Sequence, residues 1–172
     1  MEPKEIKRRT KSPEQALAAL MRLCARAEKS SGDARRLMRG WGVAPADAER
    51  VLAKLRADRF IDDRRYAAAF VREKSALNGW GVYKIRAALQ RKEVDRALID
   101  EALAALDPQG SREQLRGRLE RKLRTLKGGT PYERRTKLMR YGLSLGYDFE
   151  QVGDLVTQLL QFQDERCDTF FD

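Results

Sequence analysis

The residues of this chain that could do chemistry are few and are poorly placed for catalysis. The 172-residue sequence contains no histidine and only two cysteines, Cys24 and Cys167, which stand far apart. It therefore lacks the residues of a histidine-based triad or general base and those of the usual zinc sites. We expect no catalytic residue, no metal and no cofactor. An enzyme of nucleic-acid metabolism is therefore the function that these residues support least.

Two short motifs admit a chemical interpretation. Asp62 and Asp63 could share a proton or hold a metal ion, but adjacent acids at the start of a helix are more often an N-cap and a first-turn acid, which we favour. Gly79-Trp80-Gly81 is glycine-rich like a phosphate-binding loop, yet it lacks the preceding strand and the Gly-Lys-Ser/Thr of a P-loop. We interpret it as a turn anchored by Trp80, with stacking of Trp80 on a base as the alternative.

Positive charge is the most informative feature that remains. The chain has a formal net charge of +10, which divides into +7 for residues 1–60, +1 for 61–107, +8 for 108–147 and −6 for 148–172. Such an excess indicates nucleic acid, an anionic membrane surface or an acidic protein as the partner. We favour nucleic acid, because the helices lack the aromatic apolar face of an interfacial membrane anchor.

The helix expected from about Ser111 to Leu126 carries most of this charge. Its leucines fall on one stripe, while arginine and lysine side chains spread over the opposite face. A merely solvated face mixes signs, but residues 108–147 hold eleven basic and three acidic residues. Arginine suits bidentate contact with phosphate. The candidate binding residues are Arg116, Arg118, Arg121, Arg124, Lys127, Arg134 and Arg135, followed by Lys84 and Arg86.

The sequence is helical throughout. Leu and Ala outnumber Val and Ile by 42 to 11, which favours helix over strand. Ser12-Pro13 and Thr130-Pro131 begin capping boxes, and further N-caps are expected at Asp62 or Asp63, Asp95, Ser111 and Asp148. Breaks are expected at Gly32, Gly40–Pro45, Gly79–Gly81, Pro108–Gly110, Gly128–Pro131 and Gly146. These starts and breaks predict about nine short helices.

The helices fall into three groups with matching sequences. If Val43, Val94 and Tyr147 are equivalent turn positions, apolar residues recur eight, nine and twelve positions after each. We therefore predict an all-α fold of three tandem three-helix repeats in an elongated, curved array. The expected divisions are a basic N-terminal arm over residues 1–11, modules over 12–60, 61–107 and 108–163, and an acidic C-terminal tail over 164–172.

The middle group contains Ile61-Asp62-Asp63-Arg64-Arg65-Tyr66-Ala67-Ala68-Ala69-Phe70-Val71, the run from Gly79 to Leu89, and Lys92-Glu93-Val94. Together these residues resemble the central signature of the RecX family of bacterial RecA regulators. Residues 140–148 are similar to the family's last module. The structural signature positions are Asp62, Asp63, Tyr66, Phe70, Gly81, Ile85 and Leu89, which we assign to cap and core. Glu93 stands where the family often has glycine, so we expect no left-handed conformation in that turn.

The resemblance implies a regulator that binds RecA–DNA filaments and inhibits ATP hydrolysis, strand exchange and the co-cleavage of repressors, modulating recombination, repair and the SOS response. Direct contact with single- or double-stranded DNA is also associated with the family. The alternative is a free-standing helix-turn-helix transcriptional regulator, which would bind a specific duplex sequence without RecA.

The remaining expectations concern setting and termini. No apolar segment follows the basic N-terminus and no run approaches the roughly 18 apolar residues of a membrane span. The absence of such segments and the two widely separated cysteines together lead us to expect a monomeric cytoplasmic protein with no membrane partner. The tail, which joins acidic residues to Phe170 and Phe171, is interpreted either as a frayed helix end or as a segment that docks on a partner or on the chain's own basic face.

Overall fold

The computed structural model describes residues 10–168, with side chains up to Gln161, and all its regular elements are helices. The all-α class is therefore confirmed. The described part of the chain forms nine helices: α1 Pro13–Cys24, α2 Ser31–Gly40, α3 Pro45–Ala57, α4 Asp63–Ala76, α5 Val82–Arg91, α6 Arg96–Ala104, α7 Pro108–Thr125, α8 Pro131–Ser144 and α9 Phe149–Asp168.

Most helices begin at the capping residues that the sequence predicts. Ser12 and Thr130 each form a full capping box, with Gln15 and Glu133 as the reciprocal residues. Asp62 accepts a hydrogen bond from the backbone N–H of Arg65 at 3.0 Å, and so caps α4. Asp95 and Asp148 accept bonds of 2.8 Å in the same way at α6 and α9. Each cap satisfies a backbone donor that has no partner within its helix.

Two expected helix boundaries are wrong. The helix predicted to begin at Ser111 begins at Pro108, because Asp107 caps it by accepting from the backbone N–H groups of Gln109 and Gly110 at 3.0 and 2.8 Å. Gly32 does not break a helix but lies in the first turn of α2, which Ser30 caps.

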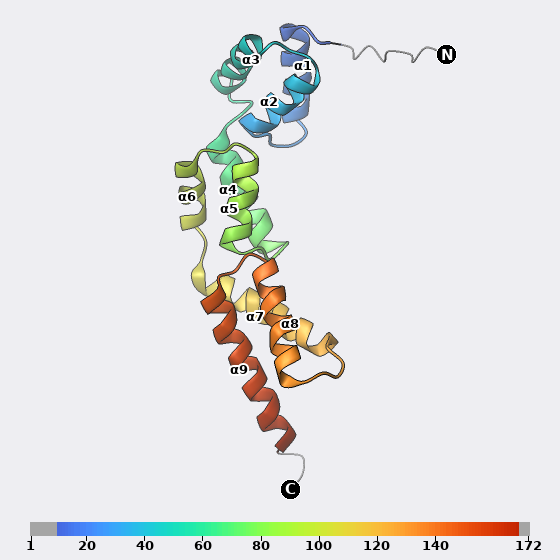
Figure 1. Ribbon diagram of the computed structural model, residues 1–172. Helices are drawn as coiled ribbons and strands as arrows, with labels where there is room; N and C mark the ends of the chain where they lie inside the picture. Colours follow the sequence, from blue (N-terminus) through green and yellow to red (C-terminus); the bar gives the residue numbers. More distant parts are fainter. Residues whose placement is uncertain (1–9, 169–172) are drawn as a thin grey trace, which may run out of the picture. The chain divides into compact units, whose positions relative to one another are not determined.

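The chain divides into two compact units. Unit 1 comprises Met1–Ala69 and Leu89–Ala102, and unit 2 comprises Phe70–Ala88 and Leu103–Asp172. In unit 1, α1, α2 and α3 surround one core (Figure 1). Its fully buried large side chains include Leu20, Met38, Leu52 and Leu55.

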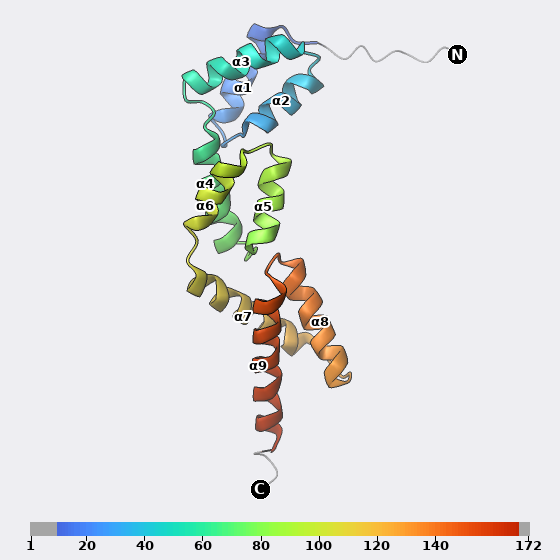
Figure 2. The same ribbon diagram turned by 60° about the vertical axis from the view of Figure 1, so that its left-hand side comes forward.

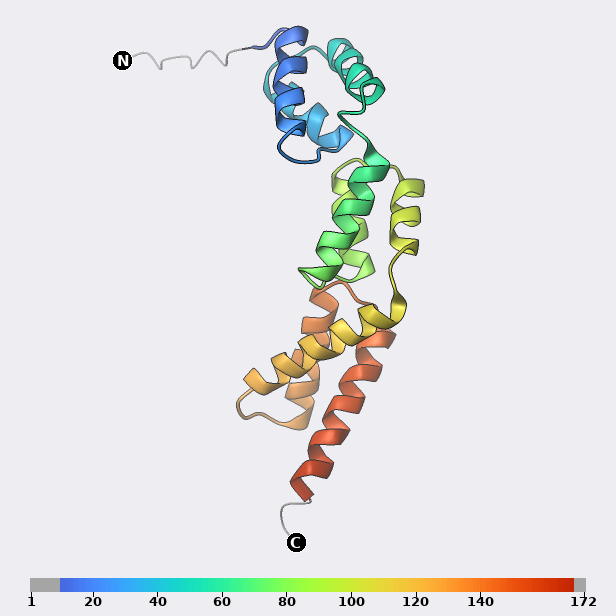
Figure 3. The ribbon, with the colours of Figure 1, turned by 180° about the vertical axis from the view of Figure 1, so that it is seen from behind.

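The core of unit 2 lies among α7, α8 and α9. Helix α7 crosses the α8–α9 pair, as Figure 3 shows from behind. Leu115 and Leu119 of α7 are fully buried, and so are Leu138 of α8 and Val152 of α9. The stripe of leucines that the sequence predicts on α7 is therefore the face that holds this helix in the unit.

The three predicted turn positions are structurally alike. Val43, Val94 and Tyr147 are each buried, and each follows a residue with positive φ. Those preceding residues are Gly42 at 71°, Glu93 at 55° and Gly146 at 89°. The apolar columns that follow are buried too, apart from Leu106, which is half-buried.

The expectation that Glu93 avoids the left-handed conformation is wrong. The N–H groups of Glu93 and Val94 donate back to Gln90 and Leu89 at 2.9 and 3.2 Å, a helix ending that requires positive φ at position 93. The geometry of the turn therefore overrides the residue type. The Glu93 carboxylate also reaches Arg35 at 3.5 Å, within unit 1.

In each turn, the backbone carbonyl two residues before the buried turn position accepts a hydrogen bond from an earlier part of the chain. The carbonyl of Trp41 accepts from the N–H of Lys11 at 3.0 Å, that of Lys92 from the hydroxyl of Ser30 at 2.9 Å, and that of Leu145 from the N–H of Gly81 at 2.8 Å. We call these contacts the joints. The first two lie within unit 1 and the third within unit 2.

Glycine is required where a helix start meets a turn. A β-carbon on Gly32 would lie 2.3 Å from the carbonyl oxygen of Lys92, and one on Gly81 would lie 2.3 Å from that of Gly146. Both obstacles are backbone atoms, which cannot rotate away. The absence of a β-carbon at Gly32 and at Gly81 therefore allows the second and third joints to form.

The predicted division into three modules stays a prediction. Helices α4, α5 and α6, which belong to the predicted middle module, each contribute to both units. Helix α9 continues to Asp168, past the predicted boundary at residue 163. Figure 2 shows α9 as the last helix of the chain.

Replacing Glu93 tests the strain at its turn. A β-carbon at this φ costs about 1 kcal/mol relative to glycine, so we expect Glu93→Gly to have a free energy of unfolding about 1 kcal/mol above that of Glu93→Ala. Both variants lose the carboxylate, so the comparison isolates the backbone. Urea denaturation measures it, and equal stabilities would contradict the left-handed turn.

Replacing Gly81 tests the joint of unit 2. We expect Gly81→Ala to lower the free energy of unfolding by about 1–3 kcal/mol, because its methyl group would overlap backbone. The control is Gly117→Ala in α7, where nothing lies within 4 Å of the added carbon. There alanine should stabilise the helix by about 0.5–1 kcal/mol. A stable Gly81→Ala protein would show that the joint tolerates a side chain.

Candidate nucleic-acid interface

The centre of the solvent face of α7 carries cations that no other described residue neutralises. Arg121 and Arg124 are exposed, as is Lys127 just beyond the helix. None of the three makes an ion pair or side-chain hydrogen bond within the described part of the chain. We call these three residues the α7 cation face. Uncompensated like charge destabilises a fold unless a partner uses it, so this face is the strongest candidate for contact with a polyanion.

Arg116 and Arg118 lie on the flanks of the same helix and are half-buried. One terminal nitrogen of Arg116 donates to Gln158 of α9 at 3.4 Å, and its Nε lies 4.0 Å from Glu120. Arg118 packs against Gly79, where an added β-carbon would lie 2.0 Å from the arginine Nε. Both residues serve contacts within unit 2 as well as carrying charge.

Arg118 also acts on a buried phenol. Burial raises the pKa of Tyr147, and the positive charge of Arg118 acts in the opposite direction. The hydroxyl of Tyr147 therefore stays neutral at physiological pH.

The candidate residues of α8 are held near the helix start. Arg134 donates through Nε to the carbonyl of Gly128 at 3.4 Å, and Arg135 donates to the Thr157 hydroxyl at 2.9 Å. Lys137 and Arg140, further along α8, are exposed and without such a bond in the described chain. Lys137 and Arg140 are not among the candidate binding residues given above, although they belong to the same strongly basic segment, residues 108–147.

Lys84 and Arg86 are half-buried in α5. The Lys84 ammonium donates to the carbonyl of Ser144 at 3.1 Å and lies 4.8 Å from the centre of the Trp80 ring. Lys84 thus helps to close the joint of unit 2. Arg86 also has a partner within the chain.

Trp80 packs rather than standing open to solvent. It is half-buried, meets Phe70 edge-on with ring centres 6.5 Å apart, and carries Lys74 at 5.6 Å on its ring. These contacts favour the interpretation of Trp80 as an anchor. Tyr132 at the start of α8 is 78 % exposed and is a better placed aromatic for stacking.

The acidic residues near the α7 cation face are otherwise engaged. Glu133 completes the capping box of α8, Glu113 accepts from Gln109 at 3.1 Å, and Glu120 lies 4.0 Å from Arg116. With eleven basic and three acidic residues, the segment 108–147 keeps a net charge of +8.

The signature residues serve the scaffold. Tyr66, Ile85 and Leu89 are buried, and Phe70 is half-buried. Asp63 accepts from both the backbone N–H and the hydroxyl of Ser31 at 2.8 and 2.5 Å, so it ties the start of α2 to α4 within unit 1. This tie goes beyond the first-turn role predicted for Asp63.

Among the described residues, no group of three or more acids or cysteines is placed to hold a metal ion, and no helix is long and apolar enough to span a bilayer. Cys24 is free and half-buried beside the core of unit 1. The N-terminal arm before Thr10 and the side chains of the acidic tail lie outside the described residues.

Comparison with known proteins points to one family. Residues 62–103 match the family model described as "RecX, second three-helix domain". The regulatory protein RecX of Mycolicibacterium vanbaalenii is 30% identical over 171 residues, which cover 96% of this chain and 93% of that protein. That of Clostridium botulinum is 33% identical over 106 residues, or 60% of this chain, so the match spans about half, 49%, of that relative's length.

Solved structures agree on the fold. The crystal structure of RecX from Lactobacillus salivarius gives a TM-score of 0.75 at 17% identity, covering 87% of this chain and 97% of that one. A second crystal structure, of a regulatory protein RecX, gives 0.78 at 21% identity, covering 85% and 73%. The all-α repeat fold is therefore shared.

Neutralising Arg121 and Arg124 should not unfold the protein. Neither side chain has a partner in the described chain, so we expect the double alanine variant to change the free energy of unfolding by no more than about 0.5 kcal/mol. The change should be a gain at low salt, where removal of repulsion matters, and should vanish at high salt. Urea denaturation at two salt concentrations tests this. A loss of stability at both would reveal an unseen structural role.

Proposed function

Because the chain belongs to the RecX family of regulatory proteins, we propose that it binds RecA on DNA and inhibits its ATPase, strand exchange and co-protease activities. In this proposal the protein acts in the cytoplasm as a monomer and modulates recombination, DNA repair and the SOS response. It performs no catalysis and needs no cofactor. The curated relatives carry the name of a regulator, which supports this class of function.

One observation carries the proposed mode of binding. The α7 cation face presents Arg121, Arg124 and Lys127 without intramolecular partners in the described chain. Arginine donates paired hydrogen bonds to phosphate, and a nucleoprotein filament exposes phosphates together with acidic protein surface. We therefore assign these three residues to contact with the filament.

The other candidate residues have a secondary place in the proposal. Arg116, Arg118, Arg134, Arg135 and Lys84 already contact groups within unit 2. Their charges add to the field around the face, but moving them onto a phosphate would break existing contacts. We expect single substitutions among them to affect binding less than those at Arg121 or Arg124.

Charge reversal tests the assignment. We expect Arg121→Glu with Arg124→Glu to raise the protein concentration that half-inhibits RecA ATPase on single-stranded DNA by about tenfold or more, because two phosphate contacts become repulsions. Arg72→Glu with Arg91→Glu is the control. It makes the same change in net charge at two exposed arginines outside the α7 cation face, and should inhibit nearly as well as the unmodified protein.

A salt series separates the alternatives. Inhibition by the unmodified protein that weakens with salt supports the proposal. Unchanged inhibition by the Arg121/Arg124 double variant would remove the α7 cation face from the interface. Sequence-specific duplex binding with no effect on RecA would favour the free-standing transcriptional regulator instead.

A further inference from the structure

Unit 1 contains a second group of arginines, away from α7 in the sequence. Arg56, Arg59 and Arg64 line a wide, open pocket of about 680 Å³, and the rest of its lining is Ile61, Asp62, Asp63 and Leu98. The sequence pattern did not single out this group, because its members belong to two helices and the segment between them.

The two acids of the pocket are already engaged by backbone. Asp62 accepts from the N–H of Arg65 at 3.0 Å and Asp63 accepts from the N–H of Ser31 at 2.8 Å. Arg56 donates through Nε and a terminal nitrogen to the Ser31 hydroxyl at 3.2 and 2.8 Å and lies 3.4 Å from Asp63, and Arg64 pairs with Glu101 at 2.9 Å. Both of these arginines keep much of their side chain exposed, at 49% and 67%.

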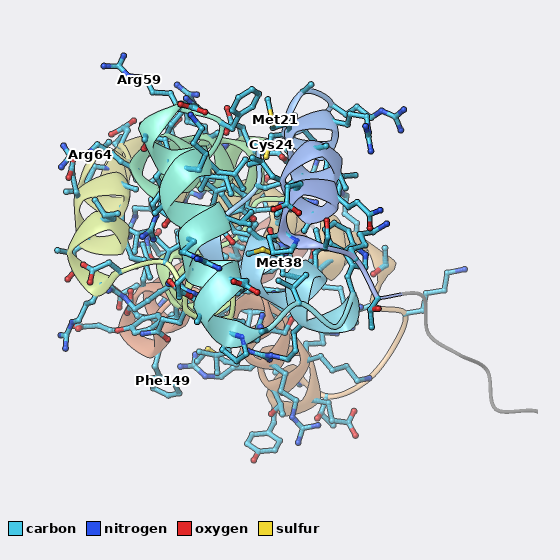
Figure 4. All side chains as sticks on the ribbon, turned by 90° about the horizontal axis from the view of Figure 1, so that it is seen from above. Met21, Cys24, Met38, Arg59, Arg64 and Phe149 are labelled. Atoms are coloured by element: carbon cyan, nitrogen blue, oxygen red, sulfur yellow. The ribbon has the colours of Figure 1, made fainter. Side chains whose placement is uncertain are left out.

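Arg59 differs from its neighbours. Its side chain is exposed and makes no ion pair or hydrogen bond within the described chain. Figure 4 shows the side chain of Arg59 extending away from the ribbon. Arg59 therefore offers all its side-chain donors to an external ligand.

The backbone of Arg59 is strained. Its φ is 58°, because α3 ends with the N–H of Arg59 donating to Arg56 at 3.0 Å and that of Phe60 donating to Leu55 at 2.8 Å. Glycine suits this position best. The other described non-glycine residue with positive φ, Glu93, contacts Arg35 through its carboxylate. At Arg59 no contact of that kind offsets the strain, and strained residues cluster at functional sites.

We propose that Arg59, which shares its pocket with the paired residues Arg56 and Arg64, binds a backbone phosphate of nucleic acid through its own guanidinium. The planar guanidinium of Arg59 suits bidentate contact with a pair of phosphate oxygens. The inference rests on the proposed function, and it gives unit 1 its own contact with the polymer that the α7 cation face of unit 2 binds. Two weak contacts on one polymer strengthen each other through effective concentration.

The test is Arg59→Gly, which separates stability from binding. Glycine relieves the strain, so the midpoint of thermal unfolding should rise. Loss of the guanidinium should weaken binding to a fluorescein-labelled single-stranded oligonucleotide about fivefold, and reduce the slope of log affinity against log salt by about 0.7. Fluorescence anisotropy across a salt series gives both quantities. A purely structural arginine predicts higher stability with unchanged binding.

Three controls sharpen the result. Glu93→Gly relieves the same kind of strain without touching the pocket, and should not weaken binding. Arg39→Ala removes one exposed charge elsewhere in unit 1, and should change affinity less than about twofold. Arg59→Lys keeps the charge but not the paired donors, so its affinity should lie between those of the unmodified protein and Arg59→Gly.

The possible failures are distinguishable. If Arg59→Gly binds the oligonucleotide with unchanged affinity and slope while the Arg121/Arg124 reversal abolishes binding, the second site is refuted and the proposed function stands. If Arg59→Gly loses inhibition of RecA yet binds the oligonucleotide normally, the ligand is acidic protein, which also refutes the phosphate site. If the unmodified protein neither binds the oligonucleotide nor inhibits RecA, the proposed function itself fails.

Discussion

The structure depends on hydrogen bonds from a preceding part of the chain to the carbonyl of a left-handed turn. At Gly81 and Gly32 this contact requires that no β-carbon stand between two backbones. Small helical groups bury little apolar surface individually, so contacts of this kind add to the cohesion of each unit. Because helix starts and turns make these contacts, the outer faces of the helices are free to carry charge.

The α7 cation face is one such charged outer face. Leu115, Leu119 and Leu123 hold α7 on the core of unit 2, so the opposite side can be almost wholly basic without loss of packing. Packing of α7 does not require unneutralised arginines there. Their presence is consistent with a partner that supplies many negative charges in a row. Arg116 and Arg118 on the flanks of α7, by contrast, are held by contacts within unit 2.

The sequence predicted the fold better than the site. Capping residues such as Ser12 and Thr130 act locally, so their positions reveal helix starts, and the recurrence around Val43, Val94 and Tyr147 reveals the equivalent turns. The start of α7 was misplaced because Ser111 is also a good cap, and the turn at Glu93 because its geometry is set by the end of α5 rather than by residue type. Periodicity shows which arginines face outward, but it cannot show which ones, like Lys84 or Arg118, find a partner within the fold. That depends on segments distant in sequence.

The central claim is that phosphate contact through unpaired cations carries binding, and the salt dependence of the unmodified protein on single-stranded DNA measures this directly. The three cations of the α7 face predict a slope of log affinity against log salt of about −2 or steeper, from about −0.7 for each phosphate contacted. An affinity that does not change with salt would contradict the account, because binding would then not arise from these charges.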